Sequence, residues 1–561
     1  MRGLEGALSA LSFQLILMCS SCWYVLTFGT HVHHECKSSR YIHTRTHAYI
    51  IKDYNYTHKQ FISAHIHSEG GFFPFESNTV CTSTLPGGRA DDLCALLLQN
   101  APGSTNNVDA QQHHTLVGEA RKRSIPENGL LGSLPIHQSP SISLNVYLNT
   151  HDPFCFVTLG VQGSGKSHSL AVVVENCVLR VNDECTTEQI MRLQKPMSSL
   201  VFHYDQNQFN LCEIIDIVDP SDQLCSFFAD LGHGVPTLPR NKMLVVVSPT
   251  NYHQRKAFYG PDVQVVPLLF TWDQLSAQQI KCLMRLNDGD NQLYVSTMLS
   301  LMRSFQRNQT MPPFQEFLTQ IHETCSVRGQ SGPLGQQLKL LEGFMKESKD
   351  NKEFHNLNIG GDLLSLLQDG MMVVADLTDP YLSPEEANGI FQVLLDQFRS
   401  HIVCGNSGGG KLLILDEVHR YISGSDSDGL SKSIVDTVRL IRHEGLRVAI
   451  STQSPKVLAP ELLELVSIMM IHRFQSEEWY TYLKSKVPLP PDGFDAVHKL
   501  HTGQALVFAA KQELEGHSDH DFRQHSLLVS VRRRFTQDLG ASVTNSICLR
   551  NKSVQVQLPL G

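Results

Sequence analysis

The chain has 561 residues, far more than one ordinary domain needs, so it can bury a large core and is expected to contain two or three structural units. Hydrophobic residues make up 41% of it and charged residues 18%, a balance that excludes a collagen-like, coiled-coil or wholly disordered chain. The formal net charge of -9 argues against a basic nucleic-acid-binding surface over the whole molecule but leaves room for a local basic channel.

The amino-terminal stretch combines an apolar run with a histidine-rich segment. Residues 7–30 carry no formal charge and are long enough to cross a bilayer as a helix, although serines, a glutamine and two cysteines interrupt the run. Residues 31–67 hold eight of the 27 histidines without a clear period, so a metal-binding segment and a disordered segment are alternatives. We expect residues 1–70 to be a disordered or mispredicted extension. This extension anchors the protein to a membrane only if residues 7–30 insert into the bilayer.

The fourteen cysteines are spread over the chain, and several stand beside apolar residues, which is typical of buried thiols in a reducing compartment. This pattern favours a cytoplasmic or nuclear location, with a membrane-anchored protein as the alternative. The CxxC pair Cys19 and Cys22 lacks a second ligand pair, so we interpret it as a chance spacing rather than a zinc or redox site.

A stretch rich in Gly, Pro, Asn and Ser separates this region from the rest of the chain. Residues 71–140 have the composition of a linker, interrupted by one short helix near residues 91–98, and we place the domain boundary near Ser141. The expected divisions beyond it are a main domain at residues 141–535, a helical insertion within it at about residues 271–365, and a tail at residues 536–561.

A glycine-rich loop follows the first apolar run of the main domain. Residues 154–159 have the pattern of a strand, the next residues read Gly-Val-Gln-Gly-Ser-Gly-Lys-Ser, and a helical pattern begins after them. Glycines let the backbone N–H groups curl around phosphate oxygens, the lysine reaches the β- and γ-phosphates, and the serine hydroxyl ligates Mg²⁺. The candidate nucleotide-binding residues are therefore Gly160, Gly163, Ser164, Gly165, Lys166, Ser167 and His168. A loop that keeps this shape without a ligand is the alternative.

A second motif supplies two acids. Residues 411–415 form a continuous apolar run, as in a buried parallel strand, and Asp416 and Glu417 follow at its carboxyl end, where ligands bind in open α/β sheets. We expect Ser167 and Asp416 to hold Mg²⁺, with Asp416 acting through a water molecule bound to the ion. We expect Glu417 to be the general base that polarises the attacking water. The alternative is a surface pair of acids that closes a strand.

Further polar residues follow other expected strands. Residues 446–452 read as a strand, and Gln453 after it is placed to sense the γ-phosphate or orient water, with a capping role as the alternative. Asp205 and Asp376 also end strands, and we interpret them as structural because Asp is common in turns. The three consecutive arginines at residues 532–534 either contact phosphates or face solvent.

The order of these motifs resembles a known family. The segments GVQGSGKSHS, LLILDEVHRYI, VRLIRHEGLR and VAISTQSPKVLAPELLELVSIMMIHRF are similar to the HerA/FtsK branch of the additional-strand P-loop ATPases. Within that branch the chain is most similar to uncharacterised fungal P-loop proteins that share NTxxPFxxVxxGVQGSGKSH. The resemblance covers residues 144–535. It implies an α/β fold of the RecA/ASCE type, a mostly parallel sheet flanked by helices.

The resemblance also implies ATP and Mg²⁺ as ligands and a homo-oligomeric motor that acts on nucleic acid. In such motors an arginine near an EGR-like turn contributes to the nucleotide of a neighbouring subunit, and the candidates here are Arg442 and Arg447. The turn reads HEGLR rather than EGR, and no HAS-type barrel precedes the P-loop. Both departures weaken an expectation of DNA translocation.

The sequence therefore predicts Mg²⁺-dependent ATP binding and hydrolysis with water activated at Glu417. An ATP-gated switch or assembly protein with little hydrolysis is the first alternative. A P-loop phosphotransferase is the second, and it is disfavoured because Glu417 is better explained as a water activator and no arginine-rich lid is evident.

Overall fold

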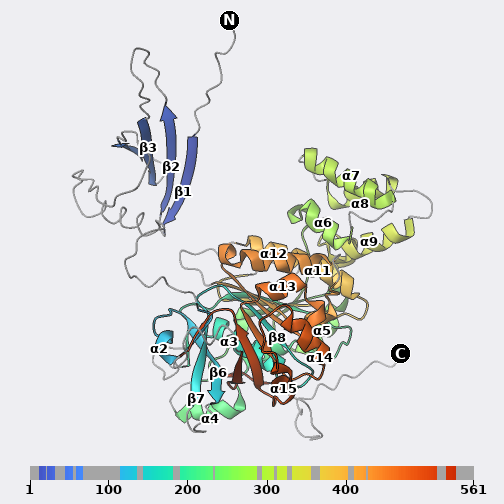
Figure 1. Ribbon diagram of the computed structural model, residues 1–561. Helices are drawn as coiled ribbons and strands as arrows, with labels where there is room; N and C mark the ends of the chain where they lie inside the picture. The colour runs from blue at the N-terminus through green and yellow to red at the C-terminus, as the bar shows by residue number, and fades with distance from the viewer. Residues whose placement is uncertain are drawn as a thin grey trace, which may run out of the picture. The chain divides into compact units, whose positions relative to one another are not determined.

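The computed structural model forms two compact units, Met1–Ala110 and Gln111–Gly561 (Figure 1). The residues that it describes are 12–19, 22–31, 45–54, 58–66, 114–135, 143–180, 190–230, 234–286, 293–308, 312–324, 331–354, 367–401, 410–424, 428–514 and 526–538.

The first unit contains an antiparallel sheet of four strands in the order of the chain. The strands are β1 (Ser12–Cys19), β2 (Cys22–His31), β3 (Arg45–Tyr54) and β4 (His58–Ile66). Strands β1 and β2 pair from Ser12 with Gly29 to Cys19 with Cys22, so the described residues of the apolar run form two paired strands rather than the single helix that we considered. Within the described part of the chain, no helix has the length and apolar character needed to span a bilayer.

A large mixed sheet organises the second unit, and the strands on one side of it, from the edge strand inward, are parallel. In spatial order the parallel strands are β12 (Val265–Pro267), β11 (Met243–Val247), β13 (Met372–Asp376), β10 (Ser198–His203), β14 (Lys411–Leu415), β15 (Leu446–Thr452), β8 (Cys155–Leu159) and β16 (Ile468–Ile471). Strand β15 lies between β8 and β14, so one additional strand separates the strand before the glycine loop from the strand before the two acids. This arrangement confirms the predicted fold class.

Mostly antiparallel strands continue the sheet beyond β16. They are β17 (Gln504–Ala509), β19 (Leu527–Val531), β6 (Asn128–Pro135), β7 (Ser143–Asn149), β5 (Leu116–Val117) and β18 (Gln512–Glu513), and β9 (Met191–Arg192) pairs with β6.

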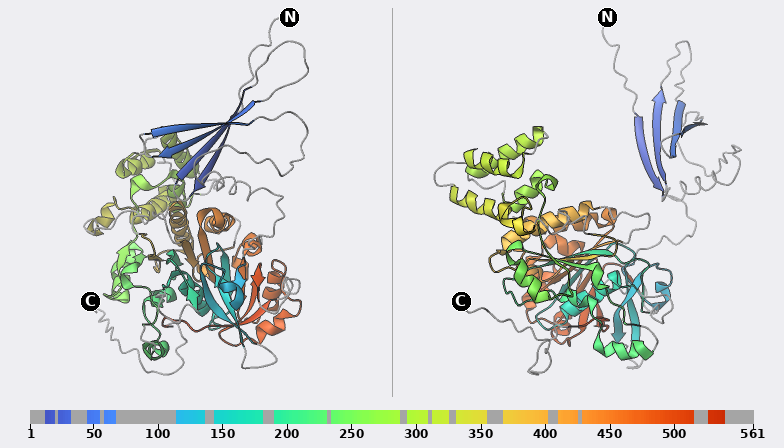
Figure 2. Two further views of the ribbon diagram at one scale, coloured as in Figure 1. Left: turned by 90° about the vertical axis from the view of Figure 1, so that its left-hand side faces the viewer. Right: turned by 180° about the vertical axis from the view of Figure 1, so that it is seen from behind.

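Both faces of the parallel sheet are covered, which explains why its strands read as continuous apolar runs. Successive side chains alternate between two hydrophobic clusters: Cys155 and Val157 join one, whereas Phe154 and Phe156 join the other. Helices α11 (Pro384–Ser400) and α12 (Gly429–Glu444) pack in the first cluster and α3 (Lys166–Val178) in the second (Figure 2). Most of α3 is buried, so its amino terminus is held firmly in place.

Helices form the insertion between β12 and β13, and they appear in green and yellow in Figures 1 and 2. They are α6 (Ala277–Leu283), α7 (Leu293–Asn308), α8 (Phe314–Thr324) and α9 (Ser331–Phe344). Helix α6 packs against α11, and within the insertion Trp272 packs on Phe314 and Phe317 of α8.

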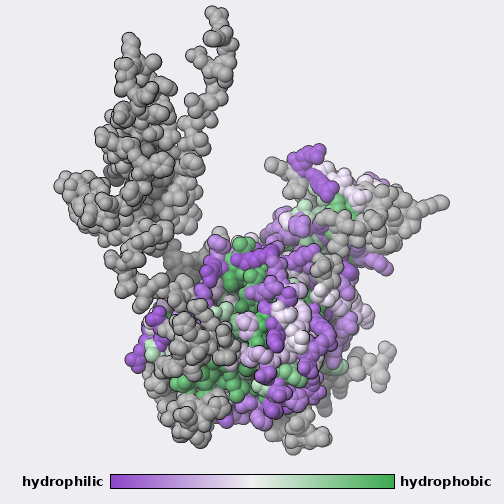
Figure 3. Space-filling model, in the orientation of Figure 1, coloured by the Kyte–Doolittle hydropathy of each residue, from purple (hydrophilic) through white to green (hydrophobic). Residues whose placement is uncertain are grey.

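Further short elements complete the unit. Figure 3 shows that its visible surface combines hydrophilic areas with hydrophobic patches. The helices among them are α2 (Glu119–Lys122), α4 (Asp222–Asp230), α5 (Tyr252–Tyr259), α13 (Pro460–Leu465), α14 (Glu477–Lys484) and α15 (Gly493–His498). The 3-10 helices are η3 (Glu213–Val218), η4 (Arg240–Lys242), η5 (Pro249–Asn251), η6 (Trp272–Gln274), η7 (Lys349–Phe354), η8 (Val418–Arg420) and η9 (Pro455–Val457).

The structure corrects the expected linker before Ser141. Residues 114–135 carry β5, α2 and β6, which belong to the same sheet as the glycine loop, whereas the short helix expected near residues 91–98 lies outside the described residues. Glycine in β6 has a packing role rather than a linker role. A Cβ on Gly132 would lie 2.2 Å from the Ser530 carbonyl oxygen of β19, so only glycine permits this approach of the two strands.

Candidate active site at the carboxyl edge of the sheet

The glycine loop connects β8 to the amino terminus of α3. Gly165 has a φ of 105°, in the left-handed region that favours glycine, and α3 begins at the next residue, Lys166. A Cβ on Gly160 would lie 2.4 Å from Ser164 Oγ and 2.8 Å from His472 Cβ, so a larger residue there would force the loop open. The loop therefore presents backbone N–H groups and a helix amino terminus at one point, which is the geometry that binds phosphate.

Lys166 and Glu417 meet at this point although they are 251 residues apart in the chain. The Lys166 ammonium forms an ion pair with Glu417 Oε1, and both side chains are largely buried. Gln453 Nε2 donates a 2.8 Å hydrogen bond to Glu417 Oε2. The carboxyl ends of β8, β14 and β15 thus bring together the lysine, the acid and the amide that the sequence singled out.

The backbone of Glu417 explains how its side chain reaches the loop. Its φ of 47° and ψ of 45° are left-handed, a conformation that costs free energy for a residue other than glycine and is concentrated at functional sites. His419 lies beside it, with Nε2 3.3 Å from Glu417 Oε2. Burial lowers the pKa of His419, which favours a neutral ring that accepts at Nδ1 from the Gln453 N–H (3.4 Å).

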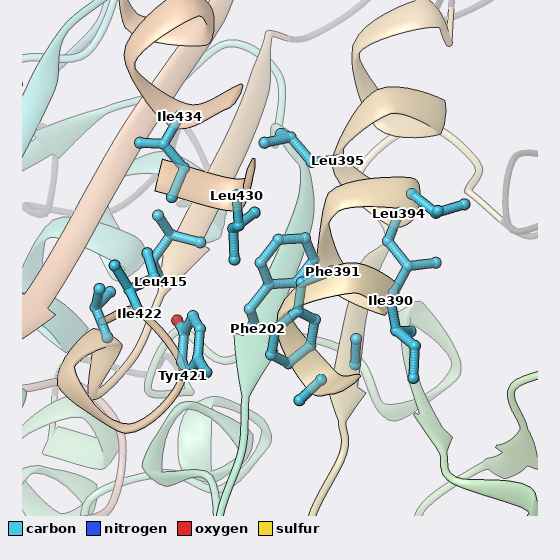
Figure 4. Close-up of a cluster of buried hydrophobic side chains, with 14 of the residues drawn as sticks. Phe202, Ile390, Phe391, Leu394, Leu395, Leu415, Tyr421, Ile422, Leu430 and Ile434 are labelled. Carbon is cyan, nitrogen blue, oxygen red and sulfur yellow. The ribbon is translucent and has the colours of Figure 1, made fainter. Parts of the chain in front are cut away.

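A hydrophobic cluster fixes the strand ends behind the site (Figure 4). Phe202, the last residue but one of β10, stacks on Phe391 of α11 with ring centroids 4.4 Å apart, and Tyr421 meets Phe391 edge to face at 5.0 Å. Because these rings are buried, the neighbouring residues His203 and Asp416 have well-defined positions. Asp416 is buried, its N–H donates to the Phe202 carbonyl (3.1 Å), and its Oδ2 lies 3.5 Å from His203 Nδ1.

Glu213, at the start of η3, is a residue of the site that the sequence did not reveal. Burial and the nearby Asp416 carboxylate raise the pKa of Glu213, whereas interaction with Ser167 lowers it. No motif surrounds Glu213, and its only signal is a position in the segment after β10, the strand next to β14. Ser167, Glu213 and Asp416 therefore gather oxygen donors and excess negative charge, which fits a hard divalent cation such as Mg²⁺.

His168, the last candidate of the loop, faces the carboxy-terminal segment of the described chain. Its Nε2 lies 2.8 Å from the Arg532 carbonyl oxygen, a hydrogen-bonding distance. The Arg532 side chain is only 7% exposed and pairs with Glu175 of α3 (2.7 Å), so this member of the triplet joins two parts of the fold instead of facing solvent or phosphate. Burial lowers the pKa of Arg532.

The two candidate arginines are not brought to the site within one chain. Arg447 is at the amino end of β15, about 17 Å of strand from Thr452. Its buried guanidinium donates to the carbonyl oxygens of Thr150 (3.0 Å), His151 and Gly445 (3.0 Å). Arg442 is exposed in the last turn of α12, beside the same amino edge.

The two strand-end acids interpreted as structural are held by other side chains. Asp205 accepts hydrogen bonds from Arg420 and Asn210. Asp376 is fully buried and accepts from Arg255 Nε (2.9 Å) and from Tyr259 (2.5 Å). Burial alone would raise the pKa of Asp376, but the Arg255 guanidinium lowers it.

No protein-family model matches the sequence, and no match is found among curated proteins. Solved structures with a similar arrangement include VirB4 of Thermoanaerobacter pseudethanolicus, at 12% identity and a TM-score of 0.40, covering 72% of this chain and 96% of that chain. The bacterial conjugative coupling protein TrwB is 12% identical with a TM-score of 0.38, covering 69% and 86%.

A third structure is the genome packaging NTPase B204 from Sulfolobus turreted icosahedral virus 2 in complex with ATP-gammaS. It is 17% identical with a TM-score of 0.21, and the match covers 28% of this chain and 71% of that chain. These similarities are too low to assign a function, which must therefore come from the chemistry of the site.

Proposed function

We propose that this protein binds ATP with Mg²⁺ at the carboxyl edge of the sheet and hydrolyses its γ-phosphate. The observation that supports this proposal is the contact of Lys166 with Glu417, and of Glu417 with Gln453, beside a glycine loop at a helix amino terminus. Phosphoryl transfer to water requires a cation that binds the phosphates, a base that accepts a proton from water, and a polar group that orients this water. Lys166, Glu417 and Gln453 provide these three groups.

In the mechanism that we propose, Lys166 exchanges its partner. The ammonium leaves the Glu417 carboxylate for the β- and γ-phosphate oxygens, where charge-assisted hydrogen bonds are strongest. Glu417 is then free to accept a proton from water, and Gln453 orients that water toward phosphorus. Ser167 and Asp416, with Glu213 nearby, would hold Mg²⁺, which when bound neutralises phosphate charge.

An ATP-gated switch with little hydrolysis is the second candidate. It is favoured by the number of groups that hold Glu417, since the carboxylate faces Lys166, Gln453, His419 and, at 3.8 Å, Arg420. A base held this firmly could respond to ATP binding by a change of partners without activating water.

We further propose a homo-oligomeric motor in which Arg442 reaches the nucleotide of a neighbouring copy, with nucleic acid as a candidate substrate. The exposure of Arg442 supports this assignment over Arg447, whose donors are taken by backbone carbonyls. A cytoplasmic or nuclear location is supported by the free thiols of Cys155, Cys177 and Cys212.

The deciding experiment compares the full chain with its Glu417→Gln variant, and uses Glu478→Gln, an exposed acid on α14, as the matched control. We expect Glu417→Gln to bind ATP while phosphate release falls by about 100-fold or more, the contribution of a general base. The control should keep the wild-type rate. Undiminished release from Glu417→Gln would rule out the assigned base, and ATP binding without turnover in the wild type would favour the switch.

A further inference from the structure

Three side chains with metal-binding atoms converge behind the phosphate loop. His203 ends β10, Cys212 precedes η3, and Asp416 follows β14. All three are buried, and a nitrogen, the sulfur and a carboxylate oxygen lie within 4.8 Å of one another. Since these residues come from three separate segments, the fold itself creates the cluster.

The histidine of this cluster provides an independent indication of a ligand. His203 is 4% exposed, yet within the described part of the chain neither of its ring nitrogens makes a hydrogen bond. Buried imidazoles in native proteins normally have partners for both nitrogens, because an unsatisfied buried polar group costs about 1–3 kcal/mol. The 3.5 Å separation of His203 Nδ1 from Asp416 Oδ2 is long for a hydrogen bond.

We propose that His203, Cys212 and Asp416 form a binding site for a thiophilic divalent cation such as Zn²⁺. Sulfur and imidazole nitrogen are poor ligands for Mg²⁺ but good ones for zinc, and three protein ligands leave the fourth tetrahedral position for an oxygen ligand. The thiol of Cys212 binds as thiolate and releases its proton to solvent. Thiolate and carboxylate then neutralise the two charges of the cation, which makes its burial favourable.

Occupation of this site has a consequence that rests on the proposed function. Asp416 is also the residue that we assign to Mg²⁺, and one carboxylate cannot serve both ions in the same way. A zinc ion held by His203 and Cys212 draws Asp416 toward itself and away from the nucleotide. The site is then an inhibitory one, in which zinc slows ATP turnover.

Binding is tested on the full chain without nucleotide, by titration with Co²⁺, whose thiolate complexes absorb by ligand-to-metal charge transfer. We expect Cys212→Ser and His203→Gln each to bind one equivalent fewer than wild type, and Cys212→Ser to lose charge-transfer absorption. Cys225→Ser, an exposed cysteine on α4, is the control and should behave as wild type. Equal stoichiometry and absorption in wild type and Cys212→Ser would overturn the site.

A second measurement uses the unaltered protein, so it does not depend on how the variants fold. Anomalous diffraction at the zinc edge from crystals grown with Zn²⁺ should show a peak between His203, Cys212 and Asp416. Peaks elsewhere only, for example in the histidine-rich segment 31–67, would refute the proposal.

The inhibitory role is tested by ATP turnover with increasing Zn²⁺, each variant being compared with its own rate without zinc. We expect Cys212→Ser to need at least tenfold more zinc than wild type or Cys225→Ser for half inhibition. The same zinc sensitivity in all three would contradict inhibition through Asp416. Because cobalt binding is measured without nucleotide, failure of the metal site and failure of the proposed ATPase give different results.

Discussion

At the residue scale, the charges of Lys166 and Glu417 control the site. Both side chains are withdrawn from water, so each needs the other until a phosphate arrives. Removal of either partner alone would leave a buried charge unpaired. In the mechanism that we propose, the exchange of Glu417 for phosphate as the partner of Lys166 couples nucleotide binding to release of the base.

His472, directly after β16, should make the stability of the folded protein depend on pH. It is fully buried between the Ser169 hydroxyl (2.9 Å) and the Gln504 carbonyl (2.9 Å), and burial lowers its pKa to about 4. The imidazole of an unfolded chain has a pKa of about 6.5. Stability from the neutral ring is therefore fully present above the unfolded pKa and is lost as the pH falls from there toward the folded pKa.

From pH 7 to pH 5 this group should remove about 2 kcal/mol from the free energy of unfolding. The free energy of unfolding is measured with denaturant at both pH values. We expect its decrease from pH 7 to pH 5 to be smaller in His472→Gln than in wild type, by about this amount. The exposed His498→Gln is the control and should keep the wild-type difference. An equal fall in wild type and His472→Gln would show that His472 is not held neutral.

At the element scale, the strand–loop–helix unit is the part that the sequence predicts best. Its strand, its glycines and Lys166 are contiguous in the chain, so local pattern alone indicates the phosphate cradle. Glu213 and Cys212 could not be predicted, because only the tertiary fold places them near Asp416. Strand β6 was missed for another reason: its glycines, which allow close strand packing, give it the composition of a linker.

The close contacts of Gly160 make a prediction for this element. Gly160→Ala would place a methyl group against Ser164 and His472, so we expect the loop to move, ATP affinity to fall at least tenfold, and the free energy of unfolding to drop by about 1–3 kcal/mol. Gly335→Ala on α9 is the matched control. A Cβ there meets nothing within 4 Å, and stability should rise by up to about 1 kcal/mol. Nucleotide titration and denaturant unfolding measure both effects, and wild-type ATP affinity in Gly160→Ala would refute the tight loop.

At the scale of the whole molecule, the candidate site and the exposed Arg442 of α12 lie at opposite ends of the parallel strands. The carboxyl ends of β8, β14 and β15 hold the site, whereas Arg442 stands near the amino end of β15. An arginine so placed cannot serve its own nucleotide. The role that we propose for Arg442 therefore requires that copies of the protein assemble head to tail.

Mixing of two defective variants tests this assembly. Arg442→Ala should lower turnover by about 10³-fold if the arginine acts on a neighbour, and Lys166→Ala should abolish it. A mixture of the two should regain activity, because an intact Lys166 in one copy can meet an intact Arg442 in the next. Arg439→Ala, exposed on the same helix and paired with Asp436, is the control and should retain the wild-type rate. No recovery on mixing would contradict action between copies.

The most direct measurement of the central claim is a crystal structure of the full-length Glu417→Gln variant with ATP and Mg²⁺. We predict that the β- and γ-phosphates lie against the backbone N–H groups of residues 163–167, with the Lys166 ammonium on phosphate and residue 417 beside a water at the γ-phosphate. ATP bound elsewhere, or Lys166 still directed at residue 417 with nucleotide present, would contradict the account.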